Sequence, residues 1–127
     1  MPQMEYRIDS RDKYILVTTS GVADPDVYEQ SLEEIFNHPD WRPGHSYIFD
    51  HSLLDASKMT KADIERIGEI ARVRRSKHGV KRSAVVAPKD VEYGIVRMWM
   101  VYAEDETQIP TNVFRTIDEA VAWLFNE

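Results

Sequence analysis

The sequence predicts an α/β protein with a single mixed sheet of about five strands and four helices, in the order ββαβαβαβα. Two strand-like segments open the chain with only a short polar turn between them, which predicts an antiparallel hairpin. After the first helix signal, three strand-like segments are each followed by a helix signal, which predicts later strands that are parallel and joined by right-handed crossovers. A length of 127 residues suits one domain, 1–127, with one core.

The N-terminal hairpin and the first helix are predicted from local patterns. In residues 4–9 apolar and charged side chains alternate, as in a strand with one buried side. Residues 14–22 are apolar or β-branched at both odd and even positions, which is typical of a more central strand. The first helix is expected to begin at Asp24-Pro25, where an acidic N-cap precedes a proline that fits the first helical position.

The middle of the chain predicts a strand followed by a second helix. The short apolar run Ser46–Asp50 fits a buried strand, with Asp50 at its end. Thr60 and Asp63 have the spacing of a capping box, so we expect the helix to begin there. Gly79 is expected to end this helix in the left-handed conformation.

The last third of the chain predicts two more strand–helix steps. Ser83–Ala87 fits a strand, and a helix is expected from about residue 89 to residue 104. A short strand follows at Asn112–Arg115. Thr116 and Glu119 then have capping-box spacing at the start of the last helix.

Composition and charge exclude several classes of function. The chain has no cysteine, which removes disulfides and thiolate chemistry, and no apolar run is long enough to span a bilayer. A net charge of −6 disfavours nonspecific binding to nucleic acid. The N-terminal residues lack the basic and apolar segments of a secretory signal, so we expect a cytoplasmic protein.

The most apolar segment is the predicted helix from Val91 to Ala103. Residues 98–102 are all large and apolar or amphipathic, and at about 100° per residue they cannot all face one sheet. Three coverings stay open: loop residues of the same chain, a second copy in a homodimer, or a lipid-like ligand. The candidate interface or ligand residues are Tyr93, Met98, Trp99, Met100 and Tyr102.

Residues 72–82 carry six cations and no acid, which leaves 10 basic and 22 acidic residues elsewhere. One interpretation is that these cations collect at a helix C-terminus, where the helix dipole favours them, and are solvated. The other is a docking patch for an acidic partner, a phosphate or an anionic membrane surface. The six residues are Arg72, Arg74, Arg75, Lys77, Lys81 and Arg82.

Several features of the chain resemble a known superfamily. The order of elements, the segment AVVAP, the Tyr93-Gly94 pair and the ending VFRTIDEAVAWL look like the STAS-like superfamily of sporulation anti-sigma-factor antagonists. They are more similar still to a bacterial branch of small proteins that also resembles CRAL-TRIO lipid carriers. The resemblance covers residues 4–125 and implies a regulatory module or a carrier of an apolar molecule.

The resemblance also implies a serine that is phosphorylated, within an Asp-Ser-Ser-Gly-type motif after the third strand. The corresponding segment, Phe49–Thr60, has no such motif, so we do not transfer this switch. Ligands still gather at such a place, because it follows a parallel strand and precedes a helix N-terminus. The alternative is that these side chains cap and brace the loop. The candidates for a polar or anion-binding edge are Asp50, Ser52, Asp55, Ser57 and Thr60.

The sequence carries no catalytic signature. Short histidine ligand spacings and the Walker, GxGxxG and GxSxG motifs are absent. Neither a metal site at Asp50, His51 and Asp55 nor a triad of His51, Ser52 and Asp55 has support beyond closeness in sequence. We predict no catalytic residue, metal or cofactor. The predicted function is a non-enzymatic, self-associating interaction module, with a carrier or sensor of a lipid-like molecule as alternative and an enzyme third.

Overall fold

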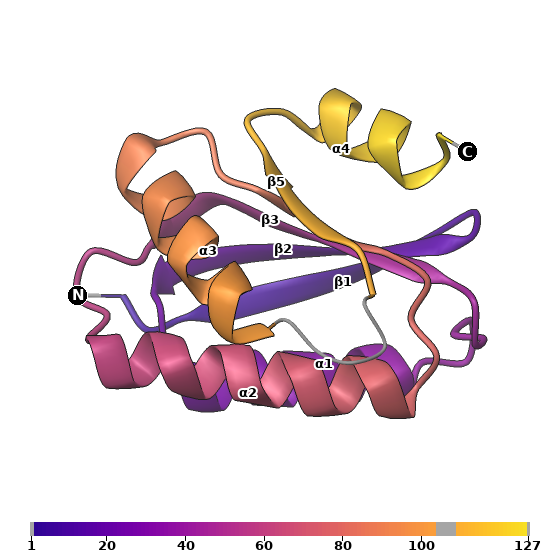
Figure 1. Cartoon of the computed structure of the whole chain (residues 1–127), viewed down its shortest axis with the longest axis horizontal. Coiled ribbons are helices and arrows are strands. Elements are labelled where there is room, and N and C mark those ends of the chain that lie inside the picture. The colour runs from indigo at the N-terminus through magenta and orange to yellow at the C-terminus, as the bar shows by residue number, and fades with distance from the viewer. Residues whose placement is uncertain (1, 104–108, 127) are drawn as a thin grey trace.

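The computed structural model describes residues 2–103 and 109–126, and within them a five-stranded sheet carries four helices (Figure 1). The order of elements is ββαβαβαβα, as the sequence predicts. The strands are β1 (Glu5–Arg11), β2 (Tyr14–Val22), β3 (Ser46–Asp55), β4 (Ser83–Val86) and β5 (Thr111–Phe114). The helices are α1 (Pro25–Phe36), α2 (Lys61–Lys77), α3 (Asp90–Ala103) and α4 (Ile117–Leu124).

The strands lie in the sheet in the order in which they occur in the chain. β1 pairs antiparallel with β2, and the other three neighbouring pairs are parallel. The predicted hairpin and the predicted parallel strands are therefore confirmed. Because every crossover advances by one strand, the C-terminal ends of β2 to β5 meet at one edge of the sheet.

The helices begin where the capping signals predict. The Asp24 carboxylate accepts a hydrogen bond of 2.9 Å from the N–H of Asp26. Thr60 and Asp63 form the expected capping box, with bonds of 3.1 and 3.0 Å between each side chain and the other's N–H. Gly79 follows α2 with φ +67°, the left-handed conformation expected of a residue that ends a helix.

The two faces of the sheet are covered unequally. α1, α2 and α3 pack on one face, which we call the three-helix face, and α4 alone packs on the other, the α4 face (Figure 1). The larger core cluster lies on the three-helix face and includes the fully buried Leu32, Tyr47 and Phe49. The smaller one lies under α4 around Leu16 and Leu124. The three-helix face therefore carries the thicker of the two layers.

β3 is longer than the sequence predicts, which corrects the placement of Asp50 at the end of a strand. Beyond Asp50 the strand continues to Asp55, paired with the end of β2. Thr18 pairs with Asp50 and Ser20 with Leu53, so β3 carries one extra residue at a β-bulge. The bulge interrupts the alternation of inward and outward side chains. A pattern of period two therefore cannot reveal the second half of the strand.

The other boundaries differ from the predictions by one or two residues. β1 continues to Arg11, so the predicted turn over residues 10–13 is shorter. β5 begins and ends one residue earlier than predicted. α3 begins at Asp90, and the predicted helix end at residue 104 lies outside the described residues.

Candidate functional site

α3 packs one side into the core and leaves part of the other exposed. Val96 and Trp99 are buried in the larger core cluster. Tyr93, Met100 and Tyr102 pack against that cluster and are partly buried. The chain thus covers Trp99 itself, and of the five candidate residues on this helix only Met98 is classed as exposed.

The exposed side of α3 carries a continuous apolar stripe. Val91, Met98 and Val101 are 53%, 50% and 68% exposed. Gly94, also exposed, lies between them, and a Cβ built on it would meet no atom within 4 Å. The spacings of three, four and three residues place these positions along one line of the helix surface. We call Val91, Gly94, Met98 and Val101 the α3 stripe.

A shallow groove of about 350 Å³ runs beside this stripe, between α3 and β5. The stripe and the groove share Val101. The lining combines apolar side chains with one cation and one amide: Tyr93, Arg97, Met100, Val101, Asn112 and Val113. The α3 stripe and this α3–β5 groove therefore form one continuous surface.

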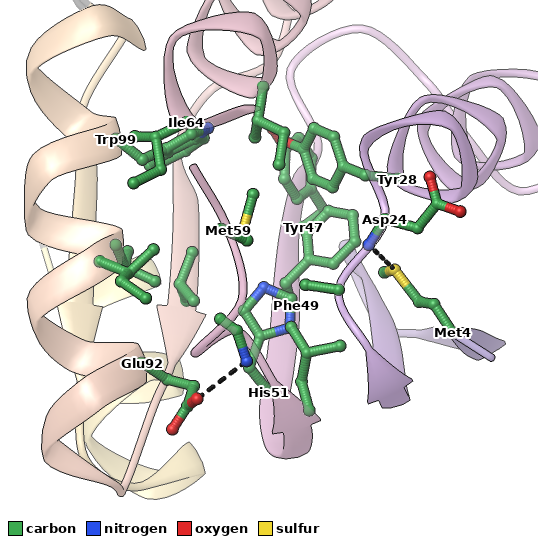
Figure 2. Close-up of a pocket in the computed structure, with 17 residues that line it drawn as sticks. Met4, Asp24, Tyr28, Tyr47, Phe49, His51, Met59, Ile64, Glu92 and Trp99 are labelled. Atoms are coloured by element: carbon green, nitrogen blue, oxygen red, sulfur yellow. Dashed lines mark hydrogen bonds between the residues drawn. The ribbon is translucent and has the colours of Figure 1, made fainter. Parts of the chain in front are cut away.

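A second, mostly apolar cavity of about 60 Å³ lies on the three-helix face, between the sheet, α2 and α3, and is partly open (Figure 2). Its walls come from β3, the loop after β3, α2, α3 and the segments around Met4 and Asp24. The Met4 sulfur accepts a hydrogen bond of 3.3 Å from the N–H of Asp24, which fixes these two segments together. The cavity occupies the place where the sequence suggests a ligand between helix and sheet.

His51 supplies a buried imidazole to this cavity. Its Nδ1 lies 2.6 Å from the Thr19 hydroxyl, which is 3.1 Å from the carbonyl oxygen of Asp50. Both contacts are satisfied when Thr19 donates to the carbonyl and His51 Nδ1 donates to Thr19. Burial lowers the pKa of His51 to about 4, although the charge of Asp50 acts in the opposite direction. The imidazole is therefore neutral near pH 7, with Nε2 as an acceptor.

Glu92 is a buried carboxylate at another wall of the cavity. It is 4% exposed, and its Oε2 accepts a hydrogen bond of 2.9 Å from the N–H of Ala56 (Figure 2). Its Oε1 is 3.7 Å from Lys89 Nζ, which also donates to the Leu54 carbonyl at 3.1 Å. These contacts tie the first turn of α3 to the end of β3. Glu92 thus positions the wall of the cavity.

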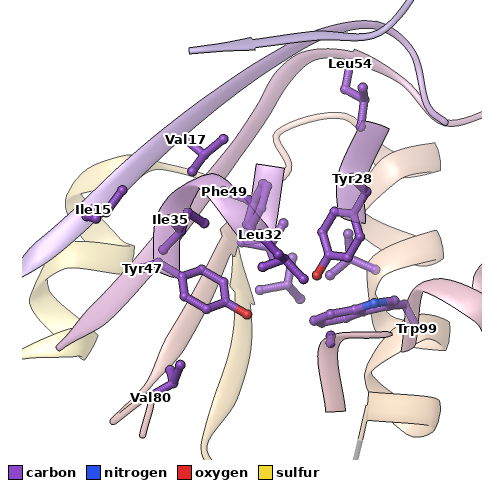
Figure 3. Packing of buried hydrophobic residues seen from close by; sticks show 14 of the residues in the cluster. Ile15, Val17, Tyr28, Leu32, Ile35, Tyr47, Phe49, Leu54, Val80 and Trp99 are labelled. Atoms are coloured by element: carbon purple, nitrogen blue, oxygen red, sulfur yellow. The ribbon is translucent and has the colours of Figure 1, made fainter. Parts of the chain in front are cut away.

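Two polar atoms in the cavity lining are buried without a hydrogen-bond partner among the described residues: Tyr47 Oη and Trp99 Nε1. The Tyr28 and Tyr47 hydroxyls both point toward the Trp99 indole (Figure 3). Burial raises the pKa of Tyr28 well above its usual value and raises that of Tyr47, although the charge of Arg75 acts in the opposite direction. An unpaired buried polar group costs about 1–3 kcal/mol, so these atoms mark a place that favours a polar guest.

The predicted polar edge does not form one site. Asp50 and Ser52 lie within β3, where the Asp50 carboxylate accepts bonds of 3.0 and 2.5 Å from the Ser52 N–H and hydroxyl. Asp55 binds Ser57 in the same way, at 2.9 and 2.6 Å, and these bonds lower the pKa of the Asp55 carboxyl. Thr60 caps α2. The five side chains thus satisfy one another or the loop backbone, the alternative that the sequence leaves open.

The six basic residues do not form one exposed patch, because Arg75 is buried at 1% exposure. Its guanidinium donates to the Ala71 carbonyl at 3.2 Å, to the Ser83 hydroxyl at 2.9 Å and to the Thr111 hydroxyl. It also lies 5.9 Å from the centre of the Trp99 ring. Arg75 therefore belongs to the core that supports the cavity.

Arg72, Arg74 and Arg82 also make contacts within the chain. Arg72 pairs with Glu69, and Arg74 pairs with acidic side chains of α1 at 3.0 and 3.4 Å. Arg82 donates to the Trp123 carbonyl at 2.5 Å and lies 5.3 Å from the centre of the Trp123 ring. Lys77 and Lys81 are exposed. Most of the cationic run thus stabilises the fold.

The described residues assemble none of the enzymatic sites considered from the sequence. No group of three His, Cys, Asp or Glu side chains among them is placed to hold a metal. His51 lines the cavity, whereas Ser52 binds Asp50, so the triad with Asp55 is not formed. In the same part of the chain, no helix combines the length and the apolar character needed to cross a bilayer.

The sequence does not single out the polar groups of the cavity. Tyr28 belongs to the apolar stripe of α1, and Tyr47 lies in a buried strand, so both have the pattern of core residues. The only sequence feature that distinguishes Tyr28 and Tyr47 is the hydroxyl group, because a phenylalanine ring would fill the core equally well at these positions.

Comparisons with known proteins find the fold among solved structures; no family model and no curated protein matches the chain. One similar structure is an uncharacterized protein of the DUF3478 family with a SpoIIAA-like fold from Shewanella loihica, with 16% identity and a TM-score of 0.59, covering 95% of this chain and 93% of that one. Another is an anti-sigma factor antagonist from Mycobacterium paratuberculosis, with 12% identity and a TM-score of 0.58. The match covers 98% of this chain and 96% of that one. This chain has a STAS-like fold of the SpoIIAA type.

Proposed function

We propose that this protein is a non-enzymatic regulatory module that acts by binding proteins, a second copy of itself included. The observation that carries this proposal is the α3 stripe, which exposes three large apolar side chains along one line of a helix. Exposed apolar side chains gathered in this way are typical of interaction sites. Likeness of fold to an anti-sigma factor antagonist agrees with a regulatory role.

A second copy of the chain suits the α3 stripe because of its shape. Gly94 leaves open space at the centre of the stripe, so the backbone of a facing helix can approach closely there. Three side chains alone cover less than the roughly 800 Å² per partner of a standard interface. The neighbouring α3–β5 groove supplies the further surface that a dimer needs. We expect a weak dimer that depends on protein concentration.

Sedimentation velocity over a range of protein concentrations tests this dimer. Met98→Lys places a charge in the middle of the stripe and is expected to weaken the dimer at least tenfold. Val73→Lys is the matched control, because Val73 is 49% exposed on α2, outside the stripe. Trp99 is unsuitable for this test because its replacement disrupts the core. A wild-type chain that stays monomeric at millimolar concentration contradicts the dimer.

A second candidate function is to carry or sense a lipid-like apolar molecule, and the cavity between the sheet, α2 and α3 favours it. Its volume of about 60 Å³ is less than half of the roughly 150 Å³ of a cavity that holds benzene. One end of a longer molecule would lie in the cavity, and the rest of the molecule would extend out through its open side. Native mass spectrometry of the protein purified from cells separates the candidates, since a copurifying mass supports the carrier and a bare dimer supports the interaction module.

A further inference from the structure

We propose that the cavity receives the polar end of a neutral, mostly apolar molecule, whose carbonyl-type oxygen accepts hydrogen bonds from Trp99 and Tyr47. This inference rests on the second candidate function and names the chemical class of the ligand. The class includes ketones, esters and amides with an aliphatic chain.

The need for an acceptor follows from the two unpartnered atoms. Trp99 Nε1 and Tyr47 Oη are buried in residues that are 7% and 1% exposed, and both residues line the cavity. An indole N–H can only donate, and a phenol hydroxyl readily donates. These two donors match the two lone pairs of a carbonyl oxygen.

The charges around the cavity favour a neutral ligand. Burial raises the pKa of Tyr28 and Tyr47, although the charge of Arg75 acts in the opposite direction, as expected where a charged form loses its hydration. The buried carboxylate residue Glu92 also lines the cavity and repels an anion. A carboxylate or phosphate head is therefore a poorer guest than a carbonyl group.

The size and the walls of the cavity favour an apolar tail that extends outward. A cavity of roughly 150 Å³ holds one benzene molecule. The cavity of about 60 Å³ in this protein therefore holds only a few heavy atoms, enough for a carbonyl group and its neighbours. Most of the remaining lining is apolar, and Met59, Ile67 and Ile95 are only partly buried. An aliphatic chain can leave the cavity along these three side chains.

The test is an NMR titration of ¹⁵N-labelled protein with three matched probes. 2-Hexanone has a carbonyl oxygen, 1-hexene lacks any acceptor, and hexanoate carries a charge. The indole N–H signal of Trp99, assigned from its through-space contacts with neighbouring protons, reports directly on the proposed hydrogen bond. Tyr47→Phe removes one donor and keeps the ring, so the core stays filled. Tyr14→Phe is the matched control, because Tyr14 packs on the α4 face.

We expect 2-hexanone to bind about 3- to 10-fold more tightly than 1-hexene, the ratio typical of one net hydrogen bond, and to move the Trp99 signal downfield. Tyr47→Phe should weaken the ketone several-fold and leave the alkene unchanged, whereas Tyr14→Phe should change neither.

Three outcomes overturn the inference. Equal affinity for ketone and alkene refutes the carbonyl but leaves the apolar carrier standing. Tighter binding of hexanoate refutes a neutral ligand. If no probe binds at millimolar concentration, the carrier function fails together with the inference.

Discussion

The polar side chains of β3 have different partners on the three-helix face and on the α4 face of the sheet. On the α4 side, Asp50 and Ser52 bind each other within β3. On the three-helix face, Tyr47 Oη has no partner among the described residues, and His51 lies in the wall of a cavity. Asp50, His51 and Ser52 are consecutive, so one strand supplies both environments. The difference teaches that closeness in sequence is a poor guide to a shared site in a strand.

The largest expected difference between the two faces is in core stability. Leu32 is fully buried under α1, whereas Leu16 on the α4 face is 9% exposed. We expect Leu32→Ala to lower the free energy of unfolding by about 3–5 kcal/mol and Leu16→Ala by about 2–3 kcal/mol. Urea denaturation measures both changes. If Leu32→Ala and Leu16→Ala lowered the free energy of unfolding equally, the two faces of the sheet would not differ in core stability.

The second prediction concerns pH and His51. The folded-state pKa of about 4 lies below the unfolded value of 6.5, so the unfolded chain binds the proton first as the pH falls. This stabilisation, about 3 kcal/mol in all, is complete above pH 6.5 and is lost as the pH falls toward 4. His51→Gln should flatten this part of the stability profile. His78→Gln should change it less, because His78 is partly exposed. A profile unaltered by His51→Gln would contradict the neutral buried imidazole.

The third prediction compares two cations of the same basic run. Arg82 donates to the carbonyls of Trp123 and Asn126 and so holds the end of α4, whereas Arg74 makes surface ion pairs with α1. Arg82→Met should cost about 1–2 kcal/mol and increase hydrogen exchange in α4. Arg74→Met should cost less than about 1 kcal/mol. The reverse order would show that α4 is held mainly by its apolar side.

The smallest expected effect is on the α4 side of β3. Ser52→Ala removes two short hydrogen bonds to Asp50, but the carboxylate is partly exposed and regains water. We expect a loss of about 0.5 kcal/mol in thermal or urea unfolding. A loss above about 2 kcal/mol would mean that this pair shapes the bulge itself.

The sequence predicts the fold well because its strongest signals are local. Thr60 with Asp63 and Asp24 with Pro25 place two helix starts, and Gly79 places a helix end. The cavity could not be predicted, because Tyr28, Tyr47 and Trp99 come from α1, β3 and α3 and meet only in the folded chain. The burial of Arg75 escaped prediction for the same reason. Its hydroxyl partners lie on β4 and β5.

The bulge in β3 decides which leucine of the pair Leu53 and Leu54 is sheltered. Leu54 is 4% exposed and lines the cavity, whereas Leu53 is 68% exposed. With strict alternation after His51, Leu53 would turn inward instead. Removing the extra residue would restore regular alternation and keep Leu54 on the inner side, so the bulge lets the strand carry one more residue without changing which leucine is buried.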